Sequence, residues 1–117
     1  MKTDLLPRPG AHLIQTVPKL SQDDVTLSGG SFVHGEVLAE IDGIHTKLDA
    51  NPDATVANKA VGVCFSRVDA TEADMPGLAH TRLAAMDGAH LVWPEGATQA
   101  QIDAWTAELE SQHIIVR

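Results

Sequence analysis

The sequence predicts a small, mainly-β domain with one α-helix near the C-terminus and an extended N-terminal arm. Short runs of apolar residues, separated by Asp-Gly, Asn-Pro and Pro-Gly turns, indicate strands between residues 37 and 93. A capped helical pattern begins at Thr98. At the start of the chain, Pro7, Pro9 and Pro18 disfavour regular structure. A length of 117 residues suits one such domain.

Residues 1–35 are predicted to form an extended arm followed by a flexible joint. Polar residues at 23–24 and the Ser-Gly-Gly-Ser run at 28–31 favour flexibility. Two interpretations of the arm remain open: a frayed terminus, or a segment that becomes ordered by adding a strand to a partner's sheet edge. The β-prone arm residues, for which the leader itself offers no partner strand, are His12, Leu13, Ile14, Gln15, Thr16 and Val17.

Residues 36–117 are expected to form the β-rich domain. Its first feature is a hairpin, because residues 37–42 and 44–48 alternate around Asp42-Gly43. Asp-Gly favours a two-residue type I′ turn, in which both central residues need a positive φ. The continuous apolar run at 60–65 predicts a strand buried on both faces.

The middle of this domain is expected to contain a surface loop followed by two strands joined by a turn. Residues 69–77 are acidic and end in Pro-Gly, which indicates a surface loop. Residues 78–86 predict a strand and Asp87-Gly88 a second turn. Residues 89–93 predict a returning strand, which Pro94 ends.

The helical pattern starts with a capping box, in which Thr98 and Gln101 satisfy backbone groups reciprocally. Three apolar residues then follow with helical spacing and predict one stripe that packs against the sheet. Residues 113–117 predict a final strand. The structural anchors expected in this region are Trp93, Pro94, Ile102, Trp105 and Leu109.

The charge distribution excludes some partners. Acidic residues outnumber basic ones 16 to 8, which gives a net charge of −8 with neutral histidines. Residues 1–20 carry a net charge of +2 and residues 21–117 a net charge of −10. An acidic body disfavours nucleic acid or a membrane as partner, because anionic surfaces attract clustered Lys and Arg. The apolar runs are too short to span a membrane. Proline breaks any signal-peptide core, and one cysteine, Cys64, fits synthesis in the cytoplasm.

Six histidines raise the question of a metal site, yet none lies in an H-E-x-x-H or H-x-H arrangement. His80 and His90 are separated by a predicted turn. Cys64 lies in the most apolar strand, where a small buried hydrophobe is expected rather than a nucleophile. Neither a phosphate-binding loop nor a G-x-S-x-G elbow is present. The sequence therefore predicts no catalytic, cofactor or metal site.

A combination of segments in order carries more information than any of them alone. Ala60–Val63 precedes Leu91–Ala97, which contains Trp-Pro-Glu-Gly; the capped helix from Thr98 follows, and the chain ends in Ile114–Arg117. This combination resembles the head decoration proteins of tailed bacteriophages, the family of the lambda head decoration protein D. The resemblance covers about residues 36–117, and the leader matches only in kind.

The resemblance implies a non-enzymatic virion protein with a β-clip-type fold and no cofactor. Such proteins assemble as homotrimers at three-fold and quasi-three-fold positions of the expanded capsid and clamp neighbouring major capsid subunits. The resemblance places the protein on the outer surface of the capsid, after synthesis in the host cytoplasm. It also implies that the arm at residues 12–17 binds the capsid.

Two alternatives from other functional classes remain open. The first is a cellular β-rich binding or adaptor domain with a peptide-like N-terminal tail. The second is a small histidine-dependent enzyme or metal protein, for which His45, His80 and His90 are the residues to test.

Overall fold

The structure is a computed structural model, and it describes residues 12–17 and 20–117. The first predicted arm residues, 1–11, and Pro18 and Lys19 lie outside the described residues. The described elements are β1 (Leu13–Gln15), β2 (Gln22–Leu27), β3 (Gly30–Phe32), β4 (Val37–Ile41), β5 (Ile44–Lys47), β6 (Gly62–Cys64), β7 (Val68–Ala70), β8 (Met75–His80), β9 (Ala84–Met86), the short 3-10 helix η1 (Gly88–His90), α1 (Gln99–Ser111) and β10 (Ile114–Val116). The predicted fold class, mainly β with one helix near the C-terminus, is confirmed.

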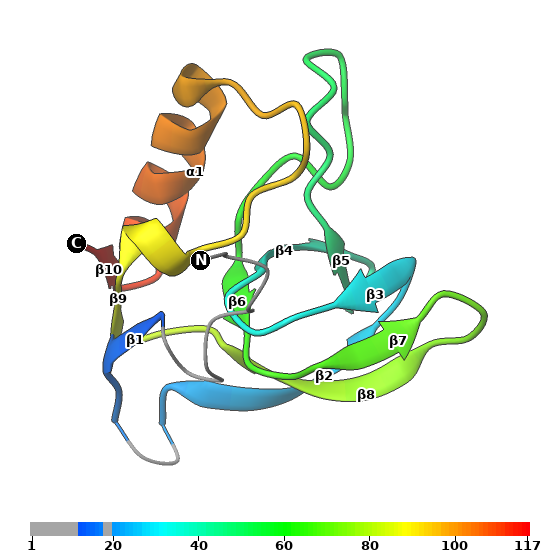
Figure 1. Cartoon of the computed structure of the whole chain (residues 1–117), viewed down its shortest axis with the longest axis horizontal. Helices are drawn as coiled ribbons and strands as arrows, with labels where there is room; N and C mark the ends of the chain where they lie inside the picture. Colours follow the sequence, from blue (N-terminus) through cyan, green and yellow to red (C-terminus); the bar gives the residue numbers. More distant parts are fainter. Residues whose placement is uncertain (1–11, 18–19) are drawn as a thin grey trace, which may run out of the picture.

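Five strands form a small closed barrel in the order β2-β5-β4-β6-β8 (Figure 1). Neighbouring strands are antiparallel except for β2 and β5. The predicted hairpin joins β4 to β5, and Asp42 and Gly43 have φ values of 51° and 84°, as a type I′ turn requires. The predicted buried strand at residues 60–65 is represented by β6, whose three residues are all buried.

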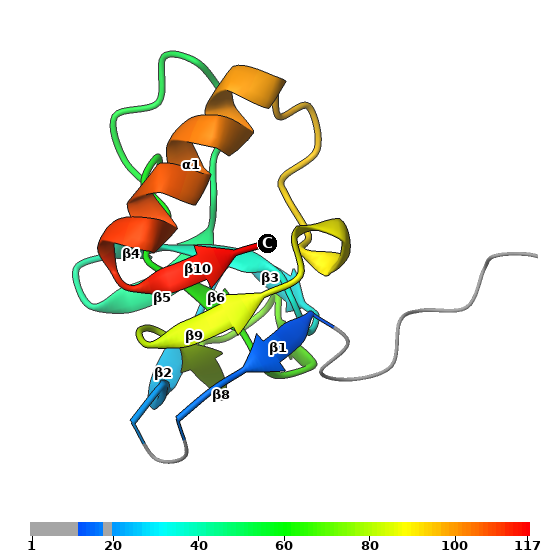
Figure 2. The ribbon, with the colours of Figure 1, turned by 90° about the vertical axis from the view of Figure 1, so that its left-hand side faces the viewer.

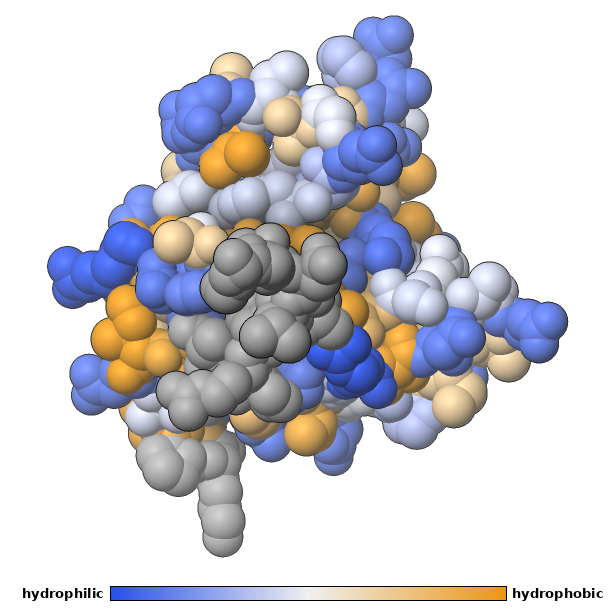
Figure 3. Space-filling view, viewed as in Figure 1, coloured by the Kyte–Doolittle hydropathy of each residue, from blue (hydrophilic) through white to orange (hydrophobic). Residues whose placement is uncertain are grey.

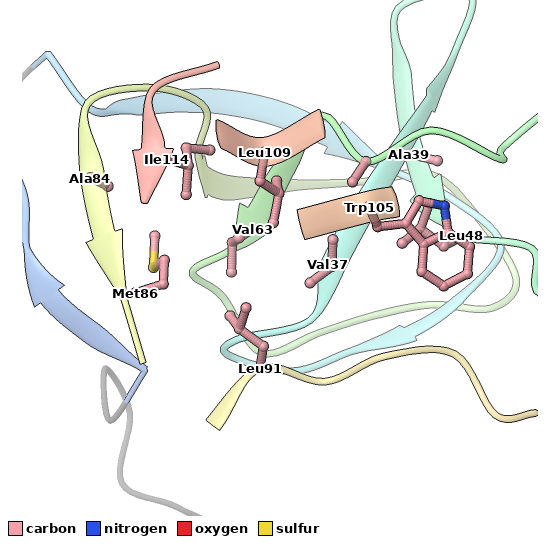
Figure 4. Packing of buried hydrophobic residues seen from close by; sticks show 11 residues of the cluster. Val37, Ala39, Leu48, Val63, Ala84, Met86, Leu91, Trp105, Leu109 and Ile114 are labelled. Carbon is pink, nitrogen blue, oxygen red and sulfur yellow. The ribbon is translucent and has the colours of Figure 1, made fainter. Parts of the chain in front are cut away.

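A second layer combines a three-stranded sheet, in the order β1-β9-β10, with α1. In Figure 2 this sheet lies in front of the barrel and α1 runs along one side of it. Figure 4 shows Trp105 and Leu109 of α1 reaching the same core as Met86 of β9 and Ile114 of β10. The predicted capping box is confirmed, because the Thr98 side chain accepts from the Gln101 N–H and the Gln101 side chain accepts from the Thr98 N–H.

The expectation of a flexible joint ahead of residue 36 is wrong, because β2 and β3 belong to the folded body. β2 pairs with β8 over six residues, from Gln22 opposite His80 to Leu27 opposite Met75. Its polar residues alternate with Val25 and Leu27, which face the interior. Asp23 accepts hydrogen bonds from Thr81 and Arg82 at the barrel surface. Asp24 lies on the exposed face of β2, whereas Asp23 lies on the same face as Val25 and Leu27 near the start of the strand, so both aspartates belong to a strand rather than a loop.

The expected strand at residues 78–86 is divided between two sheets. β8 ends at His80 and β9 begins at Ala84, and Leu83 between them has a φ of 52°, which turns the chain. β7 and the start of β8 occupy part of the loop expected at 69–77, so that prediction is also wrong in part.

The expected turn at Asp87-Gly88 is not a hairpin. Asp87 instead caps η1 by accepting from the Ala89 N–H at 3.0 Å. Of the strand expected at residues 89–93, only an isolated bridge between Glu36 and Val92 forms. An Asx-type cap and a hairpin turn use the same residue types, so the local sequence does not distinguish them.

Candidate functional site

The described part of the predicted arm lies against its own chain. β1 runs antiparallel to β9, with Leu13 opposite Met86 and Gln15 opposite Ala85, and Ile14 is the extra residue of a bulge between them. The Asp87 N–H donates to the His12 carbonyl at 2.7 Å. The partner strand of this segment is therefore β9 of the body, because the leader itself offers none.

The far end of the arm segment is also attached. The Val17 N–H donates to the Ser21 hydroxyl at 2.7 Å, and that hydroxyl donates to the Leu83 carbonyl at 2.7 Å. The Leu20 N–H donates to the Val17 carbonyl at 3.0 Å. Because Ser21 is buried, these hydrogen bonds hold Val17 and Ser21 against the turn at Leu83.

The outward face of the β1-β9-β10 sheet is apolar. Ala84, Met86 and Ile114 point to the core and are buried, whereas Ala85 and Ile115 alternate to the opposite face. A shallow groove of about 220 Å³ lies on this face. The residues of the groove, called here the sheet groove, are Gln15, Val17, Leu83, Ala84, Ala85, His113 and Ile115.

Exposed apolar side chains surround the sheet groove. Ile14, Val17 and Leu83 are 55%, 42% and 41% exposed. Figure 3 shows apolar surface on the side of the molecule where β1 and β9 lie. A contiguous apolar surface of this kind is typical of a protein contact. Among the described residues, no strand pairs with the outer edge of β1 or of β10, so the sheet also offers free backbone groups there.

The predicted anchors divide into two groups. Trp105 and Leu109 are buried in the main core, and the Trp105 indole N–H donates to the Asn58 carbonyl at 2.9 Å. Trp93 and Ile102 are partly buried against that core, and the two indole rings are stacked with centroids 6.0 Å apart.

Pro94, together with Trp93, lines a cavity of about 390 Å³. The same cavity is lined by Glu36 and Lys47, which form an ion pair of 2.8 Å. Both charges of the pair are therefore already partnered within the chain.

The three histidines named for a metal or catalytic role lie on different elements. His45 is in β5, His80 in β8 and His90 in η1. Within residues 12–17 and 20–117, no three His, Cys, Asp or Glu side chains are grouped so as to hold a metal ion. Cys64 is fully buried in β6, and burial raises the pKa of its thiol to about 11. A thiol with that pKa carries almost no nucleophilic thiolate at neutral pH.

The sequence analysis missed a cluster of three histidines around one aromatic ring. His12, His34 and His80 have ring centroids 6.2, 5.2 and 4.9 Å from that of Phe65. Their positions along the chain show no motif, because four different segments supply the rings. Only the fold brings these side chains together.

Comparison of the full sequence with known proteins gives one family. A family model described as Bacteriophage lambda head decoration protein D matches residues 7–114. The chain belongs to this phage head decoration family. No curated protein matches it.

The family match covers more of the N-terminal part of the chain than the resemblance, which was limited to about residues 36–117. The match begins at residue 7, so it includes β1, β2 and β3 as well as the domain from residue 36. This agrees with the pairing of β1 with β9 and of β2 with β8. In the described part of this decoration protein, no helix has the length and apolar character that crossing a membrane demands.

Proposed function

We propose that this protein decorates the outside of a bacteriophage head as a homotrimer. It binds the major capsid protein at three-fold and quasi-three-fold positions of the expanded shell and stabilises the shell. The family match over residues 7–114 carries the proposal. The role is structural rather than catalytic and needs no cofactor. The chain is made in the host cytoplasm and acts on the outer surface of the capsid.

The sheet groove is the contact that we assign to the neighbouring copy in the trimer. A domain of this size buries only about two-thirds of the surface of its unfolded chain. Covering Leu83, Ala85 and Ile115 in a cyclic assembly would remove further apolar surface from water. Because many trimers attach to one shell, weak contacts of each copy add up through avidity.

The N-terminal segment through Val17 is the part that we assign to the capsid. The outer edge of β1 carries backbone groups that a capsid strand would pair with, and strand addition provides affinity through such main-chain hydrogen bonds. The acidic body, with a net charge of −10 over residues 21–117, disfavours adhesion to packaged DNA.

Co-sedimentation with expanded, undecorated phage heads tests the function, and light scattering of the purified protein tests the trimer. The proposal predicts a trimeric protein that sediments with the heads. A protein that stays in the supernatant at saturating head concentration contradicts capsid decoration. A stable monomer with no affinity for heads favours the cellular binding domain instead.

A matched pair of variants tests the sheet groove. Leu83→Asp places a charge in the groove, outside the arm, and should convert the trimer to monomer; Asp tolerates the φ of 52° at this position. Val56→Asp is the control, because Val56 is 59% exposed in the loop between β5 and β6 and does not line the groove. Equal effects of the two substitutions on the molecular mass in solution would remove the groove from the proposed interface.

A further inference from the structure

The histidine cluster around Phe65 holds the N-terminal segment to the body. His12 and His80 are each 2% exposed, and their ring centroids are 6.5 Å apart. The His12 ring also packs against the backbone of Gly35, where an added Cβ would lie 3.5 Å from the ring and 2.8 Å from the His90 carbonyl oxygen. Within residues 12–17, His12 is the fully buried side chain, and Leu13 packs partly buried against the main core.

The surroundings of this cluster favour the neutral form of its imidazole rings over the protonated form. One ring nitrogen in each of His12, His34 and His80 is buried and has no hydrogen-bond partner among the described residues. A charged imidazolium carries two N–H donors, so protonation would leave a buried donor unsatisfied.

The titratable groups that face the cluster from other elements are basic side chains or carboxylates that already have partners. His90 of η1 faces His12, and Arg67, between β6 and β7, faces His34. Two nearby carboxylates have other partners: Asp87 caps η1 and lies 3.7 Å from His90, and Glu36 pairs with Lys47. Burial, with the neighbouring histidines adding to it, lowers the pKa of His12 to about 4. Burial also lowers the pKa of His34 and His80.

The segments that carry His12 and His80 differ in the number of strands that pair with them. His80 is in β8, which pairs with β2 on one side and β6 on the other. His12 precedes β1, a three-residue edge strand that pairs only with β9 among the described strands and contains a bulge. Segments with few backbone partners open at lower free-energy cost than the barrel does. Water therefore reaches the cluster most easily when β1 leaves.

We propose that His12 is an acid-sensitive latch: protonation of the cluster releases β1 from β9 while the barrel stays folded. Release frees the residues 12–17 and uncovers the edge of β9, and both can then pair with another strand. At neutral pH the latch keeps the segment docked on its own chain. This inference concerns the chain alone and does not depend on the proposed capsid role.

Amide hydrogen exchange of the full chain, normalised to intrinsic exchange rates at each pH, tests the latch. The Asp87 N–H, bonded to the His12 carbonyl, reports on β1, and the Cys64 N–H, bonded to the Glu36 carbonyl at 2.8 Å, reports on the barrel. Between pH 7 and pH 4.5, the opening constant at Asp87 should rise on the order of fiftyfold more than at Cys64. Loss of protection at both amides in step, or full protection of Asp87 at pH 4.5, would overturn the proposal.

Two variants separate the latch from general acid sensitivity. His12→Phe keeps an aromatic ring but cannot be protonated, so Asp87 should stay protected at pH 4.5. His45→Gln is the control, because His45 lies in β5, outside the cluster and the sheet groove, and burial lowers its pKa as well, so its loss should leave the release of Asp87 unchanged. If His12→Phe does not fold, His80→Phe, which leaves β1 intact, should shift the release of Asp87 to lower pH. If His12→Phe and His80→Phe both follow the pH profile of the unmodified protein, the latch is excluded.

Discussion

At the scale of the residue, burial decides which of the two tryptophans stabilises the fold. Trp105 is 3% exposed, and its indole N–H donates to the Asn58 carbonyl. Trp93 is only partly buried and stacks on the Trp105 ring. The sequence marked both as anchors, because the local pattern around each resembles that of a core aromatic. The contacts in the structure assign the larger share of the core to Trp105.

Trp105→Ala should lower the free energy of unfolding by roughly 3–5 kcal/mol, because it opens a cavity and leaves the Asn58 carbonyl without its donor. Trp93→Ala should cost about 1–2 kcal/mol, since less of its surface is removed from water. Urea unfolding followed by circular dichroism measures both. Equal losses in the two variants would contradict this division.

At the scale of the element, a turn and a helix cap could be predicted from a few neighbouring residues, whereas the pairing of strands far apart in the chain could not. The turn at Asp42-Gly43 and the capping box at Thr98 are encoded within a few residues, and both form. β1 pairs with a strand about seventy residues later, and nothing in residues 12–17 specifies β9 as the partner. The histidine cluster was not predictable for the same reason, because its rings meet only after the barrel closes.

The two parts of the leader should therefore respond differently to truncation. Removing residues 2–17 takes away β1 and the buried His12 ring, and should lower the free energy of unfolding by roughly 2–5 kcal/mol. Removing residues 2–11 leaves every described contact in place and should change stability by less than about 0.5 kcal/mol.

Thermal unfolding of the two truncated proteins beside the full chain makes this comparison. If removal of residues 2–17 leaves the melting temperature unchanged, β1 contributes nothing to the fold and the assignment of His12 to the interior is wrong.

At the scale of the whole molecule, four histidines make stability depend on pH in one direction. Burial lowers the pKa of His12, His34, His45 and His80 in the folded chain, and in the unfolded chain each returns to about 6.5. The unfolded chain therefore binds more protons below that pH, so stability falls as the pH drops. For His12 the loss continues down to about pH 4.

Urea unfolding at pH 7, 6 and 5 should show a steady fall in the free energy of unfolding. His12 alone accounts for at most about 3 kcal/mol by pH 4. In His12→Phe the slope against pH should be smaller by about one proton. A free energy of unfolding that is flat between pH 7 and pH 5 would show that these histidines bind protons equally in the folded and unfolded chains, which contradicts their lowered pKa.

In the proposed function, the whole molecule acts as part of a phage shell. Electron microscopy of expanded, undecorated phage heads mixed with the purified protein tests it most directly. Trimeric decoration predicts added density on the outer surface of the heads, as groups of three copies at the three-fold and quasi-three-fold positions. The barrel and α1 should fit into each copy. Bare heads at saturating protein, or density at other positions, would contradict it.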